Sequence, residues 1–399
     1  MISRSQAQEI IQHKAPKMPI VSLPLDKVCG YILAEDIIAS SDLPPFNNSA
    51  MDGYALKAEW VKDASESNPI SLKAQGEILA GHKDDYTKDT AVAIMTGAKV
   101  PDYYDAVIPI EMIEKDGDNI IVKTTRRQGE NIRNKASDLC KGDILITKGT
   151  LLNPYHISLM GAQAIRQVSI FQKPRIAVII TGDEIGDDND ENSQIADANG
   201  PFLKAAIAQY GGELVAFYHM SDDEAAFAKL IQRLKGKVDL IISTGAVSAG
   251  VKDFIPSEIL AEGGQIHFHK VYQRPGKPLL FAELSDGTAW FGLPGNPVAV
   301  QASFIFSLTT WLNTALQTKT TPLDYAVLKG NYTKKSDFCI FLRGNCYTDK
   351  KGQLCVELSN QQASYQLKNW GKVNCWIEAP AGIEEFNDND VVQILRINP

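Results

Sequence analysis

The sequence lacks the features that mark membrane, secreted and nucleic-acid-binding proteins. The longest apolar stretch, residues 298–316, is interrupted by Gln301 and Ser303, and no run reaches the ~18–20 residues that a membrane-spanning helix needs. The N-terminal Met-Ile-Ser-Arg-Ser-Gln has no apolar core of a signal peptide. A formal charge of −8 argues against nucleic acid as the main partner. We therefore expect a cytoplasmic protein that binds neither a membrane nor nucleic acid.

Paired cysteines are also missing. The cysteines form no CxxC pair and no metal-binding spacing, which is typical of reduced thiols in a reducing compartment. They lie at positions 29, 140, 339, 346, 355 and 375. His267 and His269 form an HxH sequence on an expected strand. A metal-binding pair would fit this sequence, but we favour solvent-facing or hydrogen-bonded histidines.

The chain is too long for one hydrophobic core, since 399 residues correspond to roughly two to four domains. Its 44% hydrophobic and 22% charged residues are ordinary for a globular protein. Changes of pattern predict four parts. These are a discontinuous N-terminal domain (1–39 and 143–172), an inserted β-rich module (40–142), an α/β domain (173–320) and a C-terminal β domain (321–399).

The N-terminal domain is predicted to be helical or extended, and the inserted module is predicted to be all-β. Ser5-x-x-Gln8 resembles a capping box that opens a helix through His13, and a second helix is expected over residues 26–36. In the inserted module, short β-rich runs alternate with turn clusters. The runs are residues 92–95, 106–110, 119–123 and 143–147, and helical sequence resumes over 154–164.

Residues 173–318 predict a doubly wound α/β domain. Residues 175–180 are continuously apolar, as expected of a parallel strand that is covered on both faces. Strand, Gly-containing loop and helix then recur, which gathers the loops at the carboxyl ends of the strands. The other expected elements are strands 213–218, 238–243 and 290–293 and helices 201–210, 224–234 and 298–316.

After Pro322 the pattern returns to short alternating strands. A hairpin turn is expected at residues 349–352. The expected strands are 324–332, 339–347, 353–358, 373–379 and 391–397. They predict a compact barrel or sandwich.

Residues 44–55, Pro-Pro-Phe-Asn-Asn-Ser-Ala-Met-Asp-Gly-Tyr-Ala, form a segment rich in rigid turn residues. Prolines fix the backbone, and Asn and Ser side chains bond to neighbouring backbone. We expect Gly53 to take a positive φ, which would place the Asp52 carboxylate on a sharp bend. Taken alone, a structural loop packed by Phe46 and Met51 explains the segment equally well.

The loops of the α/β domain predict an anion site. Backbone N–H groups of residues 244–250 and of the turn at Gly295 can point at phosphate oxygens. Asp183, Glu184 and Asp253 lie on the same loops. Because carboxylates repel phosphate unless a cation bridges them, this combination predicts Mg²⁺.

Arg274-Pro-Gly-Lys277-Pro adds two cations on a stiff bend, which suits a tetrahedral oxyanion. Each of these segments has a plainer interpretation, namely a helix cap, a tight βα loop or a solvated surface turn. Their order within one α/β domain favours a common site.

Together these segments resemble the molybdopterin molybdenumtransferases, the family that includes the E domain of gephyrin. The GLPGNP sequence alone is shared with molybdopterin adenylyltransferases, and the segment 44–55 separates the two. The matching motifs are PPFxNSAMDGYA (44–55), IMTGA (94–98), TGDE (181–184), QxxDxN (194–199), STGAVSAGxxDF (243–254), RPGKP (274–278) and GLPGNP (292–297).

The resemblance implies that molybdate is inserted into adenylylated molybdopterin, with Mg²⁺-dependent release of AMP. Glu184 and Asp253 would hold the metal, and Asp52 and Asp138 would join them as catalytic residues. Arg274, Lys277, Arg343 and Ser364 would bind molybdate. The other implied substrate-binding residues are Thr96, Arg133, Asp183, Asp222, Thr244, Gly245, Ser248, Pro294, Gly295, Asn296 and Pro297.

The resemblance also implies partners. It implies a homodimer in which the β-rich module reaches the α/β domain of a second subunit, and contacts with molybdopterin adenylyltransferase and molybdoenzyme maturation proteins. Two alternatives remain: an adenylyltransferase that uses ATP, and a gephyrin-like scaffold. The lack of a long Pro/Ser-rich linker counts against the scaffold.

Overall fold

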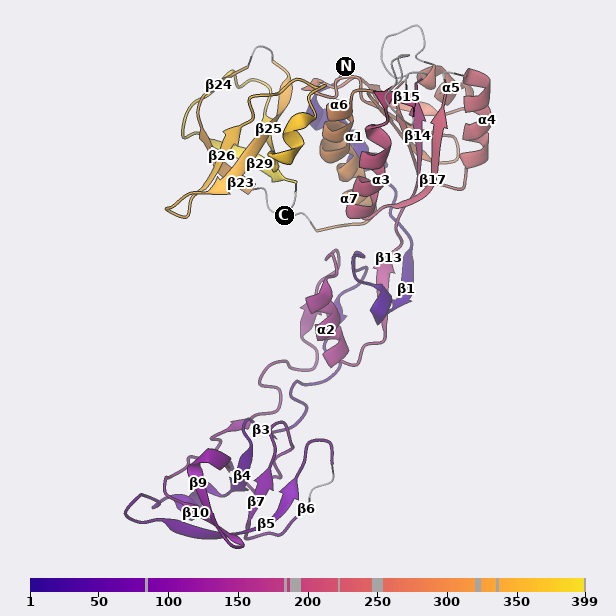
Figure 1. Cartoon of the computed structure of the whole chain (residues 1–399). Coiled ribbons are helices and arrows are strands. Elements are labelled where there is room, and N and C mark those ends of the chain that lie inside the picture. The colour runs from indigo at the N-terminus through magenta and orange to yellow at the C-terminus, as the bar shows by residue number, and fades with distance from the viewer. Residues whose placement is uncertain are drawn as a thin grey trace. The chain divides into compact units, whose positions relative to one another are not determined.

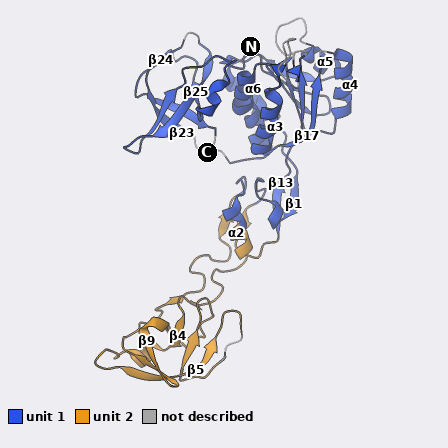
Figure 2. Cartoon of the chain, in the orientation of Figure 1, with its two compact units in different colours: residues 1–35, 148–157, 167–399 blue, residues 36–147, 158–166 orange. Residues whose placement is uncertain are grey.

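In the computed structural model, the chain forms two compact units (Figure 2). The first unit holds residues 1–35, 148–157 and 167–399, and the second holds residues 36–147 and 158–166. The described residues are 1–82, 85–182, 185–186, 195–221, 223–245, 254–319, 324–334 and 337–397. Within these ranges, no helix has both the length and the apolar character needed to cross a membrane. The finer four-part division stays a prediction.

A mixed sheet with the strand order β17-β14-β18-β22-β21-β19 forms the centre of the first unit (Figure 1). The strands from β17 to β22 run parallel, whereas β21 and β19 are antiparallel additions at one edge. Every residue of β14 after Arg175 is buried. The strands span Arg175–Thr181 (β14), Glu213–Met220 (β17), Leu240–Thr244 (β18), Gln265–His269 (β19), Leu280–Glu283 (β21) and Ala289–Leu293 (β22).

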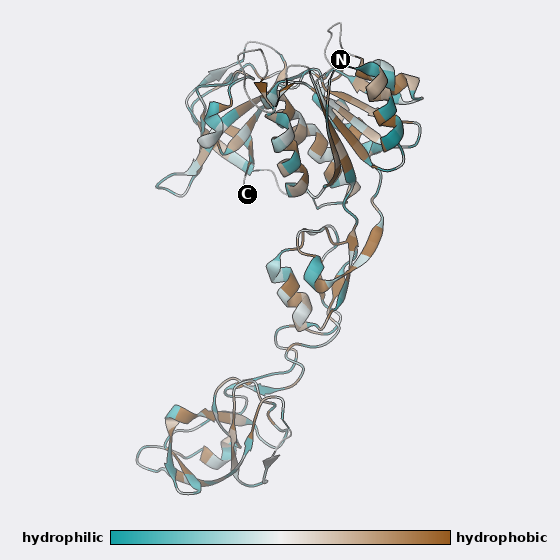
Figure 3. Cartoon of the chain, turned by 45° about the vertical axis from the view of Figure 1, so that its right-hand side comes forward, coloured by the Kyte–Doolittle hydropathy of each residue, from teal (hydrophilic) through white to brown (hydrophobic). Residues whose placement is uncertain are grey.

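Helices cover both faces of this sheet. Successive side chains of a strand point to opposite faces, so Val178 packs against one helical layer and Ile179 against the other. The central strands β14, β18 and β22 are accordingly mostly hydrophobic (Figure 3). The first layer is α1 (Arg4–Lys14), α3 (Asn199–Gln209), α6 (Pro297–Ser303), the π-helical turn η4 (Phe304–Leu308) and α7 (Thr309–Ala315); the second is α4 (Glu224–Leu234) and α5 (Ile255–Ala261). The predicted doubly wound α/β domain is confirmed.

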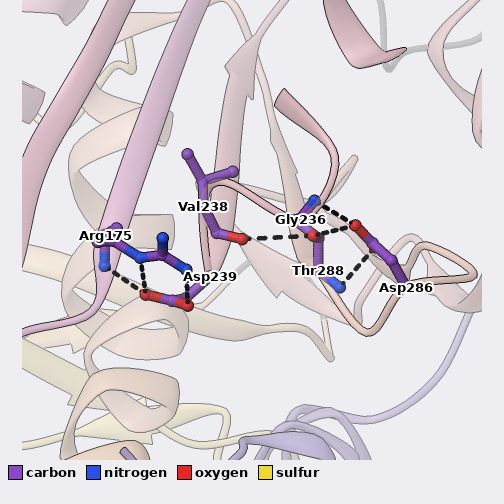
Figure 4. A network of polar contacts seen from close by, with 6 residues as sticks. All are labelled: Arg175, Gly236, Val238, Asp239, Asp286 and Thr288. Carbon is purple, nitrogen blue, oxygen red and sulfur yellow. Dashed lines mark hydrogen bonds and ion pairs between the residues drawn. The ribbon is translucent and has the colours of Figure 1, made fainter. Parts of the chain in front are cut away.

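A polar network ties the amino-terminal ends of β14, β18 and β22 together (Figure 4). The Asp239 carboxylate accepts hydrogen bonds from the Arg175 backbone N–H (2.7 Å) and from Arg175 Nη2 (2.9 Å), and the side-chain bond is the main cause of a raised pKa of Arg175. The Asp286 carboxylate accepts from the N–H groups of Gly236 and Thr288. The network therefore fixes the sheet at the end opposite to the loops that carry the candidate site.

The C-terminal strands close into a barrel, which confirms one of the two predicted forms. The order β25-β26-β23-β29-β27 returns to β25, so each of these strands has two neighbours. Closure removes the exposed edges that an open sheet would present. The strands span Asp324–Lys329 (β23), Cys339–Thr348 (β25), Leu354–Leu358 (β26), Cys375–Ala379 (β27) and Val391–Arg396 (β29). The ribbon of β24 (Tyr332–Thr333) and β28 (Glu385–Phe386) and the 3₁₀ turn η5 (Lys368–Gly371) lie in the same region.

The cap of α1 differs from its prediction by two residues. The Ser3 hydroxyl accepts from the Gln6 N–H, and the Gln6 side chain accepts from the Ser3 N–H. The capping box is therefore Ser3-x-x-Gln6, and not Ser5-x-x-Gln8.

The helix predicted over residues 26–36 is wrong. A short 3₁₀ turn, η1 (Leu25–Lys27), is followed by Gly30 with a φ of +81°, a conformation that ends a right-handed helix. Ile32 and Leu33 then form β-bridges instead. The first unit also contains two short two-stranded sheets. In one, β1 (Ile20–Pro24) pairs with β13 (Gln167–Phe171), and in the other, β15 (Ile185–Gly186) pairs with β16 (Ile195–Ala196).

The second unit is built on a sheet with the order β8-β4-β7-β5-β10-β9, with β6 paired to β5. Tyr54 and Ala55 of β4 belong to separate apolar clusters, as expected for neighbouring residues of a buried strand. The predicted all-β module is confirmed. Its elements are β2 (Ile37–Ile38), β3 (Asn48–Ser49), β4 (Gly53–Leu56), η2 (Ala58–Val61), β5 (Ile70–Ile78), β6 (Asp85–Tyr86), β7 (Ala91–Ile94), β8 (Ala106–Pro109), η3 (Ile110–Met112), β9 (Ile113–Asp116), β10 (Asn119–Val122), β11 (Ile132–Arg133), β12 (Ile144–Ile146) and, shared with the first unit, α2 (Pro154–Ala162).

Candidate functional site

A cavity of about 870 Å³ lies in the first unit, between the loops of the α/β sheet and the barrel. The α/β side follows the carboxyl ends of β18 and β22, which is where open α/β sheets bind ligands. The lining residues are Gly245, 274–278, 294–296 and Ala299 from the α/β side, and Tyr332, Thr333, 340–342 and 362–365 from the C-terminal region. Of the predicted site residues, it gathers Gly245, Arg274, Lys277, Pro294, Gly295, Asn296 and Ser364.

Two glycine turns form the floor on the α/β side. Gly245 follows the buried Thr244 and has a φ of +82°, and a Cβ there would lie 2.7 Å from Thr181 Oγ1. A Cβ on Gly295 would lie 3.9 Å from Gly245 Cα, so the two turns face each other closely. Because neither turn carries a side chain, a ligand can approach the backbone directly.

The Gly295 turn is held from behind by a pair of polar side chains. The buried Asn199 donates from Nδ2 to the Gly295 carbonyl oxygen (2.8 Å). Asp197 accepts from the N–H groups of Asn199 and Gly200, and its other oxygen lies 3.1 Å from His219 Nε2. These residues were not assigned from the sequence, although the QxxDxN motif contains Asp197 and Asn199. Pro297 follows the turn as the first residue of α6.

The cavity is positively charged. Among its described lining residues, Arg274 and Lys277 are charged and none is a carboxylate. Their bend is fixed by Gly276, whose φ is +92° and whose Cβ would meet the Ser303 hydroxyl at 2.6 Å. The two cations and the exposed turns are suited to an anion with several oxygen atoms.

Arg343 lies behind the cavity wall and does not line the cavity. It is 1% exposed, and its guanidinium donates to the carbonyl oxygens of Gln361 (2.8 Å), Ala363 (3.0 Å) and Gln366. Burial lowers the pKa of Arg343. The guanidinium thus holds in place the loop that carries Ser364. Arg343 was predicted to bind molybdate, but its guanidinium is bonded to backbone carbonyl oxygens, whereas Arg274 and Lys277 line the cavity.

The C-terminal region contributes residues that the sequence did not indicate. Tyr332 and Phe341 line the cavity. Burial raises the pKa of Tyr332, while the charge of Arg274 acts in the opposite direction. The phenol therefore stays protonated at neutral pH and can donate a hydrogen bond. No local sequence signal marks these residues, because they reach the cavity only through the folding of the C-terminal region.

The second unit carries a separate group of predicted residues. Asp52 Oδ1 accepts from both the N–H and the hydroxyl of Thr96, each at 2.7 Å. The Thr96 hydroxyl is the larger cause, and its N–H the next, of a lowered pKa of Asp52. An exposed, firmly held carboxylate of this kind stays ionised over the physiological range.

Residues 43–55 make the backbone contacts that bring this group together. The Leu43 carbonyl accepts from the Asp138 N–H, and the Asn48–Ser49 strand pairs with Ile132–Arg133. The side chains of Arg133 and Asp138 are exposed. Hydrogen bonds therefore connect the loops that carry Asp52, Thr96, Arg133 and Asp138.

The expected positive φ of Gly53 is wrong. Gly53 is absent from the positive-φ glycines of the described chain, and a Cβ there would lie 1.9 Å from the Ile108 carbonyl oxygen. Glycine is required because β4 and β8 approach too closely for a side chain. The nearby left-handed glycine is Gly97, with a φ of +80°.

The predicted metal ligands, Glu184 and Asp253, lie outside the described residues, as do Asp183, Asp222 and Ser248. Within the described ranges, no cluster of three or more His, Cys, Asp or Glu side chains is placed to hold a metal ion. Of the two histidines of the HxH sequence, His267 has a polar neighbour, since its Nε2 lies 3.3 Å from Glu283 Oε2.

Comparisons with known proteins agree with this architecture. Residues 2–164 match the family model described as the MoeA N-terminal region (domain I and II), and residues 177–314 match a probable molybdopterin binding domain. The molybdopterin biosynthesis moeA protein from Pyrococcus horikoshii has a solved structure with a TM-score of 0.83 and 26% identity, and the match covers 99% of both chains.

Relatives of known name cover almost the whole chain. The molybdopterin molybdenumtransferase of Synechococcus elongatus is 32% identical, with 96% of each chain covered. That of Staphylococcus aureus is 30% identical and covers 98% of this chain and 94% of its own length. Fold and motifs thus define a multidomain protein with a molybdopterin-binding type of α/β domain. The chain belongs to the molybdopterin molybdenumtransferase family, whose members are named as transferases, and the resemblance drawn from the motifs is confirmed.

Proposed function

We propose that this chain inserts molybdate into adenylylated molybdopterin and releases AMP, which forms the molybdenum cofactor. The observation that carries the proposal is the cavity at the ends of β18 and β22, where Arg274 and Lys277 face the glycine turns and no described lining residue is acidic. Both substrates are anions, and both would be attracted there. The names of the relatives support the same activity.

The residues of the cavity would divide the binding between them. Arg274 offers a planar fork and Lys277 a compact charge for the tetrahedral oxyanion, and Ser364 adds a hydroxyl from the fastened loop. The backbone at Gly245 and Gly295 would receive the phosphate-bearing part of the other substrate. Holding both anions beside each other would shorten their approach and lower the barrier to reaction.

We propose that Mg²⁺ is bound by Glu184 and Asp253, with Asp183, the neighbour of Glu184, and Asp222, which follows β17, as further acidic candidates. The support is that the Thr181 hydroxyl donates to the Thr244 carbonyl oxygen at 2.8 Å, so the loops that leave β14 and β18 begin side by side. When bound, a divalent cation would neutralise charge on pyrophosphate oxygens. Glu184→Gln or Asp253→Asn should abolish Mg²⁺-dependent AMP release and leave the melting temperature unchanged.

We further propose a homodimer in which Asp52, Thr96, Arg133 and Asp138 of one copy complete the cavity of the other. Apolar side chains around Asp52 support a covered surface. Exposed ones are Phe46, Met51, Met95, Ile110 and Met112. Contacts with molybdopterin adenylyltransferase and molybdoenzyme maturation proteins, and a cytoplasmic location, belong to the same proposal.

The deciding experiment supplies purified chain with adenylylated molybdopterin, Mg²⁺ and molybdate. We expect AMP release that depends on molybdate and yields cofactor able to activate an apo-molybdoenzyme. Formation of the AMP adduct from ATP, without dependence on molybdate, would instead identify an adenylyltransferase. Neither activity, with retained dimerisation and partner binding, would favour a scaffold.

A further inference from the structure

Phe338 lies next to both cations of the cavity. Arg274 Cζ lies over its ring at 5.7 Å from the centroid, and Lys277 Nζ lies over it at 5.6 Å. Two neighbouring positive side chains repel each other, and exposed long side chains have many alternative rotamers. The negative face of an aromatic ring attracts a cation within about 6 Å. One ring therefore opposes the separation of both cations.

The ring is itself held in place. Tyr272 stacks on it with the centroids 4.5 Å apart and an interplanar angle of 20°. The backbone N–H of Cys339, the next residue, donates to the Tyr272 carbonyl oxygen (3.1 Å). The strand β20 (Gln273–Arg274) then pairs in parallel with the start of β25. The same backbone pairing thus sets the position of the ring and of the first cation.

The described residues that line the cavity include no carboxylate that could hold these two cations together. A carboxylate there would also compete with an anionic ligand for the two cations. An aromatic ring attracts cations without carrying a net charge. It therefore leaves the full positive charge of Arg274 and Lys277 available to a ligand.

We propose that Phe338 is a positioning residue that holds Arg274 and Lys277 together as a site for one doubly charged tetrahedral oxyanion. The inference rests on the proposed function, in which molybdate is that oxyanion. Phe338 would act on the affinity for the anion through the two cations, without touching the anion itself.

The test replaces Phe338 with pentafluorophenylalanine, which keeps the shape of the ring and removes its negative face. Molybdate binding is measured by calorimetry on the full chain, in a buffer without phosphate or sulfate. We expect the dissociation constant to rise about fivefold, from the loss of two exposed cation–ring contacts. Phe338→Leu should weaken binding at least as much, and Phe338→Trp should retain it.

Tyr325→Leu is the matched control, because it removes a 56%-exposed ring from β23 of the same barrel. It should leave the dissociation constant unchanged. A dissociation constant that stays at the wild-type value in the fluorinated variant would overturn the role of Phe338, whatever happens to its melting temperature. If the wild-type chain bound no molybdate at all, that result would contradict the proposed function, and the role of Phe338 that rests on it would be rejected as well.

Discussion

Thr96 donates two hydrogen bonds to a single oxygen of Asp52, one from its backbone and one from its hydroxyl, both at 2.7 Å. This contact joins the turn that begins β4 to the turn that follows β7. It also holds the pKa of Asp52 below its ordinary value of 3.8. The carboxylate therefore has both a fixed position and a fixed charge.

Thr96→Val removes the hydroxyl donor and keeps the backbone donor. We expect the pKa of Asp52 to move up towards its ordinary value, since the hydroxyl is the largest cause of the shift. Thr96→Ser should keep the wild-type pKa. Carboxyl-carbon NMR of chain labelled at aspartate measures both, and equal titration of Asp52 in wild type and in the valine variant would contradict this expectation.

Arg343→Lys keeps a positive charge but offers its N–H groups from a single nitrogen, so it loses the planar fork that spans the three carbonyl oxygens of the loop that carries Ser364. If Arg343 fastens this loop, the lysine variant should behave like Arg343→Met, with faster amide hydrogen exchange in residues 359–366 and about 2 kcal/mol less unfolding free energy. Ser364→Ala is the control, because it removes a cavity hydroxyl without freeing the loop. A lysine variant with wild-type exchange and a methionine variant that fails only in molybdate binding would make Arg343 a direct ligand.

A site shared between subunits predicts complementation. Asp52→Asn chain and Lys277→Ala chain should each be inactive, whereas subunits mixed and reassembled should regain about one quarter of wild-type activity, because half of the dimers are mixed and each has one intact site. The activity is measured as molybdate-dependent AMP release. Mixing two inactive variants that both change the second unit, Asp52→Asn chain and Asp138→Asn chain, should restore nothing, because each site then receives one altered residue. Recovery in that control would contradict the shared site.

His267 predicts a contribution to the pH dependence of stability. Burial is the main cause that lowers the pKa of His267 below 6.5, the charge of Lys14 acts in the same direction, and Glu283 opposes it. Because the folded chain then binds fewer protons than the unfolded chain, its stability falls as the pH drops through about 6.5 towards the folded pKa. Chemical unfolding of His267→Gln between pH 7 and 5 should show a weaker loss of stability than wild type. The exposed His82 gives the control variant, His82→Gln, which should follow wild type.

The strands of the α/β sheet were predictable because burial on both faces leaves a continuous apolar run, as in residues 175–180. The strands of the barrel were predictable one by one. Its closure was not, because the pairing of β25 with β27 joins residues with no local signal of contact. The helix predicted over residues 26–36 was wrong because Gly30, with a φ of +81°, follows the short turn that begins at Leu25 and prevents a right-handed helix from continuing.

The residues of the candidate site can also be separated into those that the sequence predicted and those that it did not. The bend from Arg274 to Lys277 and the turns at Gly245 and Gly295 were predicted, because rigid backbone needs particular residue types that the sequence displays. Tyr332, Phe341 and Phe338 were not, since a barrel aromatic has the same local pattern whether it faces a core or a cavity. Gly53 was recognised as special for the wrong physical reason, a backbone angle in place of a close approach.

Phe341, which lines the cavity, also packs against the α/β domain. Its ring stacks on Phe306 of the π-helical turn, with the centroids 3.7 Å apart and the planes within 5°. A chain shortened before β23 would consequently lose one side of its binding site and leave Phe306, now 6% exposed, open to water. The barrel is therefore no detachable appendage, and we expect it to melt together with the α/β domain in a single cooperative transition.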